Sequence, residues 1–332
     1  MTYLILRFQS LGNVAMTVPV LASASELQPD DTFVVVAKKR LHGMFYGLPN
    51  VRFHEVDFGN GSLKSLLQVY RELNTYHIDH VLDLQNVLRT WILRFLFRLQ
   101  GVRSTVIRYE RARKWAMAKL GTGRNKPLLT EFERYAETFR RAGLQTDDRF
   151  SELPVNEAAA AEVTARFGIK NGRWIGLAPF AKSKTNMLPY RTIKSLLTRL
   201  GTQPQTQVFL FGAGQVECEL LRQWADGHDH IISVAGELSL EQELELMRQL
   251  DVMICMDSAN QHLSALVGLR AISVWCGTHP KMGFYSWKQQ PEDRIELKDI
   301  ACRPCTVHGT NYCRYGNFAC QQINENQIID KI

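Results

Sequence analysis

DVMICMDSANQHLSALVGLRAISVWCGTHP, residues 251–280, contains the pattern that decides the fold. Its apolar run 252–256 has the length and composition of a buried strand, and this run ends at Asp257. Apolar residues at a helical spacing follow, and a second short apolar run occupies 271–275. The stretch therefore predicts a strand, a helix and another strand, with Asp257 and Ser258 at the turn where the helix begins.

This turn has two interpretations. Free backbone N–H groups and the positive end of the helix gather there, and in open α/β sheets such turns bind anionic ligands. The pattern thus indicates a phosphate- or diphosphate-binding turn. Asp and Ser are also ordinary N-cap residues, so a helix cap without a ligand is the alternative.

The same alternation of strands and helices runs through both halves of the chain. It predicts an α/β protein in which parallel sheets are covered by helices on both faces. We expect two domains, each a wound α/β sheet, at residues 1–150 and 151–332, joined by a linker at 147–155. Strands are expected at 3–8, 32–37, 51–56, 80–84, 174–179, 207–211, 231–234, 252–256 and 271–275. Gly12 and Asn13 follow the first of them, at its carboxyl end.

Composition narrows the class of protein. The chain has 332 residues, of which 45% are hydrophobic and 22% charged, so it can bury a large core. No apolar run approaches the length of a bilayer span, and we expect a cytoplasmic protein. The formal charge of +7 indicates an anionic partner. Nucleic acid is disfavoured, because the aromatic residues belong to apolar segments and no nucleic-acid-reading motif is present.

Residues 89–119 form a basic region. They contain nine Arg or Lys residues and one acid, Glu110. A basic helix with an aromatic face suits an anionic membrane surface. The alternative is an amphipathic helix packed on the sheet, and we expect such packing for the apolar residues Trp91, Ile92, Phe95, Leu96 and Leu99.

Four of the seven cysteines lie close together in the last 31 residues, at Cys302, Cys305, Cys313 and Cys320. The first two have a zinc-like C-x2-C spacing, but the last two do not. A structural zinc ion, disulfides and simple packing of thiols are the three alternatives, and His308 is a substitute zinc ligand.

Several segments together resemble one family. Residues 257–263, followed by 275–280, are similar to the signature of the ADP-heptose:lipopolysaccharide heptosyltransferases, glycosyltransferase family 9. Residues 7–14 resemble its opening segment, 178–182 its mid-chain loop, and 302–305 a tail seen in some members. The resemblance implies the GT-B architecture, two Rossmann-like domains facing across a cleft, and chemistry that requires no metal or other cofactor.

The resemblance also implies ligands for each domain. The carboxyl-terminal domain would hold an ADP-sugar, with Asp257 at the sugar or diphosphate and the N–H groups of residues 258–260 around the diphosphate. The amino-terminal domain would receive an anionic lipid-linked saccharide of the lipopolysaccharide core, at the inner face of the inner membrane. The candidate substrate-binding residues are Gly12, Lys182, Asp257, Ser258, Ala259, Asn260, His262 and Thr278.

The implied reaction is inverting transfer of a heptose or similar sugar. It needs a base for the acceptor hydroxyl and positive charge for the departing diphosphate. Where the family has an Asp base this chain has Asn13, which cannot remove a proton. Where the family has a Lys this chain has Asn186, although a two-residue shift would let Lys184 serve.

His279 is the candidate replacement base, so the candidate catalytic residues are Asn13, Lys184, Asn186 and His279. The alternative to an active transferase is a family member that binds nucleotide-sugar or acceptor without turnover.

Overall fold

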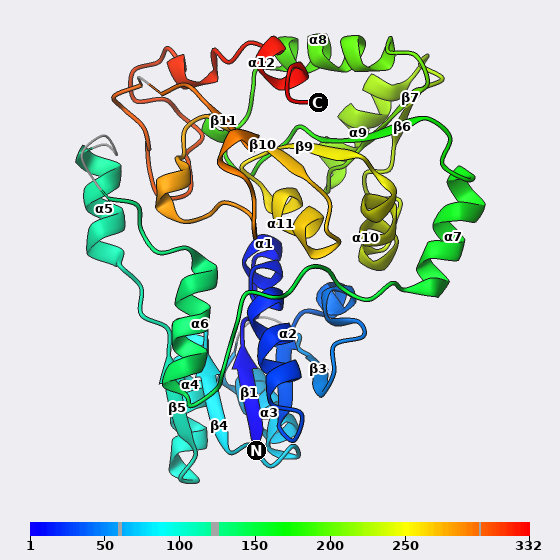
Figure 1. Cartoon of the computed structure of the whole chain (residues 1–332). Coiled ribbons are helices and arrows are strands. Elements are labelled where there is room, and N and C mark those ends of the chain that lie inside the picture. Colours follow the sequence, from blue (N-terminus) through cyan, green and yellow to red (C-terminus); the bar gives the residue numbers. More distant parts are fainter. Residues whose placement is uncertain (59–61, 121–125, 299) are drawn as a thin grey trace. The chain divides into compact units, whose positions relative to one another are not determined.

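A computed structural model describes residues 1–58, 62–120, 126–298 and 300–332 (Figure 1). The chain forms two compact units. The first comprises residues 1–109 and 131–155, and the second comprises 110–130 and 156–332. Residues 110–130 group with the second unit because their packing partners lie there: Met117 and Leu128 form a small buried cluster with Met282.

The first unit is built on a five-stranded parallel sheet. Its order is β3-β2-β1-β4-β5. The strands are β1 (Thr2–Leu6), β2 (Thr32–Ala37), β3 (Val51–Glu55), β4 (His80–Asp83) and β5 (Arg103–Val106). The three inner strands are largely buried, as expected for a sheet covered on both faces, and β1 and β2 are mainly apolar.

Helices cover both faces of this sheet. On one face, α3 (Leu63–Asn74) and α4 (Leu88–Leu99) share a buried apolar cluster with β1, β2 and β4. On the other, α2 (Val18–Leu27) contacts α6 (Glu131–Arg141). After β1 the chain forms two successive helices, α1 (Leu11–Ala15) and then α2. Pro19 has no N–H to continue the first helix, and it lies in the first turn of the second.

The second unit contains a six-stranded parallel sheet of order β11-β10-β9-β6-β7-β8. Its strands are β6 (Arg173–Ala178), β7 (Thr206–Leu210), β8 (Ile231–Ser233), β9 (Val252–Met256), β10 (Ala271–Trp275) and β11 (Arg294–Glu296). Its helices are α5 (Arg111–Leu120), α7 (Glu157–Phe167), α8 (Tyr190–Gly201), α9 (Gln215–Ala225), α10 (Leu240–Gln249), α11 (Ala259–Leu266) and α12 (Asn326–Ile329).

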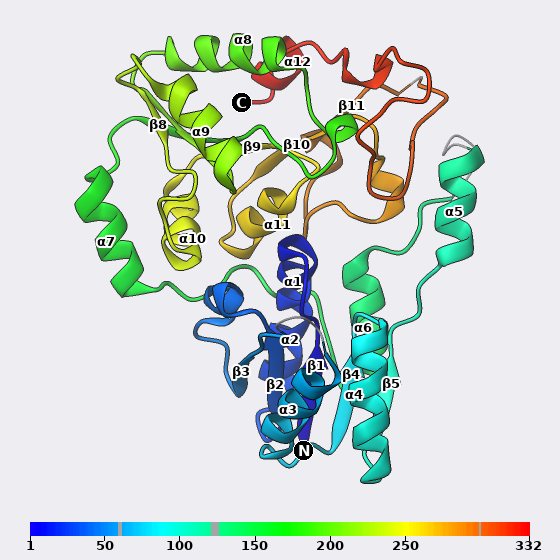
Figure 2. The same ribbon diagram turned by 180° about the vertical axis from the view of Figure 1, so that it is seen from behind.

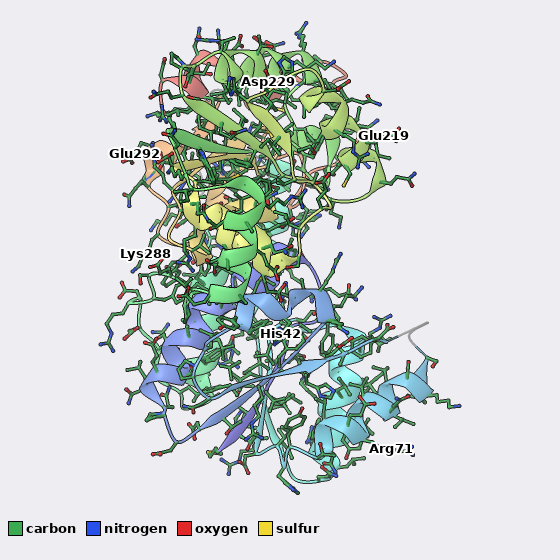
Figure 3. The ribbon with its side chains drawn as sticks, turned by 90° about the vertical axis from the view of Figure 1, so that its right-hand side faces the viewer. His42, Arg71, Glu219, Asp229, Lys288 and Glu292 are labelled. Atoms are coloured by element: carbon green, nitrogen blue, oxygen red, sulfur yellow. The ribbon has the colours of Figure 1, made fainter. Side chains whose placement is uncertain are left out.

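Two helical layers enclose this second sheet. α8, α9 and α12 pack on one face and share one apolar cluster with the strands. α10 contacts both α7 and α11 on the other side. Figure 2 shows the end of the chain beside α8, where Ser195 donates a hydrogen bond to Glu325. Charged side chains such as Arg71, Glu219 and Asp229 lie at the surface (Figure 3), so the buried charges described below are exceptions.

Each sheet reverses its winding direction once. In the first unit the chain runs outward from β1 to β3 and returns to place β4 beside β1. In the second it runs outward from β6 to β8 and returns to place β9 beside β6. The carboxyl ends of strands at such a switch point are where open α/β sheets bind ligands. The loops after β1, β6 and β9 carry predicted site residues.

The α/β class with two parallel sheets is confirmed. Every strand expected from the sequence is present, with its ends shifted by at most two residues. The elements missed include β5, which begins with an exposed arginine, the three-residue β11, α7 and the four-residue α12. None of the described helices combines the length and apolar character that a membrane-spanning segment requires.

Candidate functional site

The carboxyl group of Asp257 lies at the switch point of the second sheet, directly after β9. Three side chains from three different segments donate hydrogen bonds to it. Thr278 Oγ1 donates to Oδ2 at 2.6 Å, Gln261 Nε2 to Oδ1 at 3.2 Å, and Asn186 Nδ2 to Oδ2 at 3.4 Å. The structure therefore brings together three predicted site residues, Asn186, Asp257 and Thr278.

All three donors to Asp257 are neutral, which affects its titration. Burial raises the pKa of Asp257 to about 6, although the hydrogen bonds from Thr278 and Gln261 and the charge of Arg303 act in the opposite direction. A carboxyl group with this pKa is partly protonated in mildly acidic solution. Through its hydrogen bonds, the Asp257 carboxyl group links the loops that follow β6, β9 and β10.

The helix after this strand is α11, whose N-cap is Ser258. The first N–H groups of a helix have no acceptor within the helix. The Ser258 hydroxyl does not cap them, and it is buried without a hydrogen-bond partner in the described structure. Ser258, Ala259 and Asn260 remain partly exposed, so this helix end is not sealed inside the protein.

His262 lies further along α11 and is 6% exposed. Burial lowers its pKa to about 3, so its ring is neutral at pH 7. A neutral, buried ring at this position packs behind the helix tip rather than supplying positive charge to it.

Asn186 occupies a closed position. It is 3% exposed, and its Nδ2 also donates to the carbonyl oxygen of His308. A Cβ atom added to Gly309 would come within 2.2 Å of Asn186 Oδ1. Lys182 and Lys184, in contrast, are exposed. The local positive charge therefore lies at Lys182 and Lys184, on the surface, while position 186 is filled by an amide beneath the tail of the chain.

Residues 305–310 of the tail are hydrogen-bonded onto these loops. Thr185 and Thr310 exchange backbone and hydroxyl hydrogen bonds of 2.8–3.0 Å. The Cys305 N–H donates to the Gly277 carbonyl, and the Gly277 N–H to the Thr185 carbonyl. These bonds fix the mid-chain loop against the strand end of β10.

Arg303 is a residue whose role the sequence did not reveal. It is 3% exposed, and its guanidinium donates twice to the carbonyl of Thr278 and once to that of Leu297. It also pairs with Glu296 at 3.0 Å. Arg303 thus positions the loop that carries Thr278. Its only signal in the sequence is its place between Cys302 and Cys305.

His279 lies beside that arginine and is partly exposed. Its Nδ1 accepts the N–H of Lys281 at 3.1 Å, and its Nε2 lies 3.5 Å from a carboxylate oxygen of Glu296. Burial, with the charges of Arg303 and Lys281, lowers the pKa of His279 to about 4. Both ring nitrogens have neighbours, and the ring is a weak base. The predicted catalytic role of His279 stays a prediction.

The predicted residues Gly12 and Asn13 belong to the first unit, at the switch point beside β1. Both are partly exposed and lie in the short helix α1. Tyr135, which is fully buried on α6, donates its hydroxyl to the Asn13 carbonyl at 3.4 Å. Arg7 follows β1 and is 6% exposed. Asp83, at the end of neighbouring β4, is fully buried and pairs with Arg94 at 2.8 Å.

The four clustered cysteines are free thiols. Cys320 is buried, and burial raises its pKa to about 11, whereas backbone N–H groups, first that of Phe318, lower the pKa of Cys313. Among the residues the structure describes, no three or more His, Cys, Asp or Glu side chains are arranged to hold a metal ion. A zinc ion at Cys302, Cys305, Cys313 and Cys320 stays a prediction.

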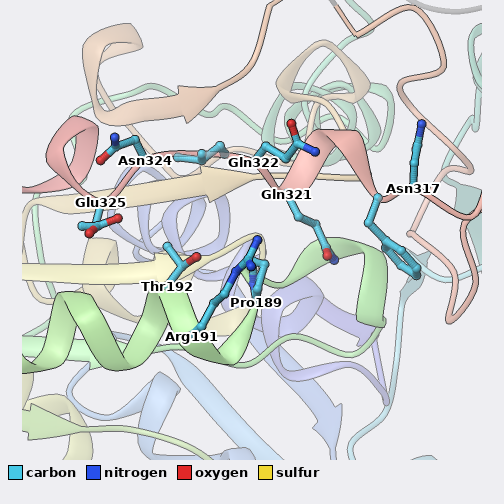
Figure 4. A pocket seen from close by; sticks show the side chains of 10 residues that line it. Pro189, Arg191, Thr192, Asn317, Gln321, Gln322, Asn324 and Glu325 are labelled. Carbon is cyan, nitrogen blue, oxygen red and sulfur yellow. The ribbon is translucent and has the colours of Figure 1, made fainter.

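A separate cavity of about 430 Å³ lies between the start of α8 and the tail (Figure 4). Polar side chains, including Arg191, Gln322 and Glu325, line it together with Phe318. It contains none of the predicted site residues.

Residues 66–314 match the sequence profile of Glycosyltransferase family 9 (heptosyltransferase). The chain belongs to glycosyltransferase family 9. The matched segment includes the loop at 178–189 and the turn at Asp257, and it ends before Cys320. A sequence search among curated proteins finds no match.

Solved structures of this kind share the fold over the whole chain. A glycosyl transferase family 9 protein from Veillonella parvula is 18% identical, with a TM-score of 0.77, over 99% of this chain and 95% of that one. E. coli ADP-heptose lps heptosyltransferase II is 16% identical, with a TM-score of 0.69, over 100% and 97%. E. coli heptosyltransferase WaaC, solved with ADP, is 17% identical, with a TM-score of 0.66, over 100% and 97%. The fold of this family 9 member is thus of the GT-B type.

Proposed function

We propose that this family 9 member is an inverting glycosyltransferase that moves a heptose, or a similar sugar, from an ADP-sugar to an anionic saccharide acceptor of the lipopolysaccharide core. The observation that carries the proposal is the turn at Asp257 and Ser258. It lies at the switch point of the second sheet, its helix end is partly exposed, and its serine hydroxyl has no hydrogen-bond partner among the residues that the structure describes. Family membership and the ADP found with WaaC support the same ligand class.

In this proposal the diphosphate of the donor lies at the start of α11. Free N–H groups and the helix dipole stabilise negative charge there, which increases as the sugar–phosphate bond breaks. The hydroxyl of Ser258 donates to a phosphate oxygen. Lys182 and Lys184, both exposed, supply the positive charge that Asn186 cannot.

The acceptor is proposed to bind the first unit near Gly12 and Asn13. The amide of Asn13 orients the acceptor hydroxyl but does not deprotonate it. Loss of a general base typically lowers the rate by about 10²–10⁴-fold. We therefore expect slow turnover. The alternative, a protein that binds its ligands without turnover, rests on the uncharged side chains at positions 13 and 186.

Donor binding is tested first. ADP and ADP-heptose at millimolar concentration are expected to raise the melting temperature of the protein, because a ligand that binds only the folded state stabilises it. Ser258→Asp adds a negative charge to the proposed diphosphate site and should abolish this shift. Ser239→Asp makes the same change at the N-cap of α10 and should leave the shift unchanged. No shift with either ligand would exclude the nucleotide site.

Catalysis is tested with Asn13→Asp. A large gain in sugar transfer, on the order of 10²-fold or more, is expected if only the base is missing. An active wild type that this substitution does not affect would place the base elsewhere. If neither protein transfers sugar although both bind ADP-sugar, the binding-only alternative is correct.

A further inference from the structure

The helix α4 has two apolar faces. Leu93 and Phe97 point into the core of the first unit and are at most 1% exposed. A second set of large apolar side chains occupies the opposite side of the helix, at a spacing of three or four residues. These residues form what we call the outer stripe, and their exposed fractions are Leu88 72%, Trp91 55%, Phe95 49% and Leu99 71%.

The outer stripe corrects an expectation from the sequence. Trp91, Phe95 and Leu99 were expected to pack on the sheet, and this is wrong because Thr90, Leu93 and Phe97 occupy that face instead. The rings of Trp91 and Phe95 are stacked on each other, with centroids 5.9 Å apart and an interplanar angle of 13°. A continuous exposed apolar surface of this kind marks a site of interaction with a membrane or another protein.

The charge around the stripe distinguishes between these partners. Residues 84–109 contain five arginines and no acidic residue. Arg98, which neighbours the stripe on α4, and Arg103, at the start of β5, are both exposed. Within the described parts of the chain neither of them forms an ion pair. A second copy of the chain would bring further positive charge against this surface, whereas a bilayer with anionic headgroups would neutralise it.

We propose that the outer stripe of α4 is a membrane-docking surface. Leu88, Trp91, Phe95 and Leu99 enter the boundary between headgroups and acyl chains, and Arg98 and Arg103 contact anionic headgroups. Aromatic side chains are favoured at this depth, and an interfacial helix combines such an apolar face with basic flanks. The inference rests on the proposed function in one respect: a lipid-linked acceptor would lie at the bilayer surface to which α4 binds.

The test uses the full chain and vesicles that carry no saccharide. Binding to vesicles of phosphatidylcholine and phosphatidylglycerol is measured by co-sedimentation and compared with phosphatidylcholine alone. The wild type should prefer the anionic vesicles. Trp91→Gln/Phe95→Gln should weaken binding about tenfold or more, since both rings lose their apolar contact. The matched control, Ile169→Gln/Val216→Gln, removes two side chains that are 87% and 71% exposed elsewhere, and should change binding less than twofold.

The basic flank is tested separately. Arg98→Gln/Arg103→Gln should weaken binding to anionic vesicles by about 25-fold, because each basic residue near the surface contributes about a factor of five. It should leave the weak binding to neutral vesicles unchanged. Quenching by brominated lipid should be strong in the wild type and much reduced in Trp91→Phe, which removes the tryptophan proposed to enter the bilayer.

Three results would overturn the proposal: equal binding by the wild type and Trp91→Gln/Phe95→Gln, no preference for anionic vesicles, or a dimer that this double variant dissociates while the wild type ignores vesicles. The melting-temperature shift with ADP is measured on the same proteins. It should be the same in all of them, so failure of membrane docking is distinguishable from failure of the nucleotide site.

Discussion

The two sheets hold a carboxyl group at corresponding places, fully buried in the first unit and partly exposed in the second, and the neighbours of the two groups differ. In the first unit, Asp83 ends β4 and pairs with the guanidinium of Arg94. In the second, Asp257 follows β9 and receives hydrogen bonds from Thr278, Gln261 and the amide of Asn186. A charged partner stabilises the ionised carboxylate, whereas neutral donors in a buried site leave its protonated form accessible. The same topology therefore supports an ion pair in one unit and a carboxyl group with a raised pKa in the other.

The largest expected effect is that of breaking the ion pair in the first unit. Arg94→Met leaves Asp83 buried without its cation, although the N–H groups of Gln85 and Asn86 still donate to it. We expect a loss of about 4 kcal/mol in local stability. Hydrogen exchange of β4 measures it, because protection reports the free energy of opening of each region.

A matched control for this change is Arg199→Met, which removes an exposed arginine on α8. It should alter the free energy of opening of β4 by less than about 0.5 kcal/mol. Unchanged exchange in β4 of Arg94→Met would show that the ion pair does not stabilise the first unit.

The next largest effect concerns the closed position of Asn186. Gly309→Ala places a methyl group against the Asn186 side chain, and Gly309 has a φ of +82°. We expect a loss of about 3 kcal/mol in the second unit, from both the clash and the backbone strain. Gly316 has a φ of +71°, and no atom lies within 4 Å of a Cβ added there. Gly316→Ala therefore introduces the backbone strain without a clash, and it should cost about 1 kcal/mol.

Both glycine variants are measured by hydrogen exchange of the loop at 183–186. If both variants lose the same protection in this loop, Asn186 is not enclosed as described.

The third prediction is a pH dependence. Burial raises the pKa of Asp257 to about 6, above its ordinary value of 3.8. Between these values the folded state binds more protons than the unfolded state, so stability falls as the pH rises from about 4 to about 6. The shift corresponds to about 3 kcal/mol, reduced to about 2 kcal/mol because Asp257 remains partly exposed.

Asp257→Asn cannot titrate, so its stability relative to the wild type should increase by about 2 kcal/mol between pH 4 and pH 7. Hydrogen exchange of β9 in both proteins at several pH values gives this difference. A difference that does not depend on pH would mean that Asp257 is ionised throughout, as expected for a carboxylate with a charged partner.

The smallest effect is one of reaction rate. Backbone N–H groups lower the pKa of Cys313, while burial raises that of Cys320 to about 11. Iodoacetamide should therefore modify Cys313 at least tenfold faster than Cys320 at neutral pH, since the thiolate is the nucleophile. Peptide mapping measures the rates, and unfolding in urea should make them equal.

Chelation extends the same experiment to the zinc prediction. If Cys302, Cys305, Cys313 and Cys320 bind a metal, all four should resist alkylation until a chelator removes it. Equal rates with and without chelator would contradict a metal site.

The sequence predicted the fold well where local patterns are strong. Short apolar runs such as 252–256 identify buried strands because parallel sheets bury both faces. The failures came from long-range effects. Trp91, Phe95 and Leu99 were expected to pack on the sheet because both faces of α4 are apolar, and only the packing of Leu93 and Phe97 shows which face is buried.

The candidate site was predictable in part. Asp257 and Thr278 follow neighbouring strands, so their proximity could be inferred from the order of the strands. The close contact between Gly309 and Asn186 and the hydrogen bonds from Arg303 to Thr278 could not be predicted. Both depend on how the tail folds back onto the second unit. More than a hundred residues separate Asn186 from Gly309, and no local pattern links them.

Hydrogen exchange with and without ADP tests the central claim most directly, that the second unit binds a nucleotide diphosphate at the start of α11. We predict that ADP protects the amides of residues 257–262 and the loop at 182–186, and that Ser258→Asp abolishes this protection. ADP that protects neither segment at saturating concentration, or protects them equally in Ser258→Asp, would contradict the account.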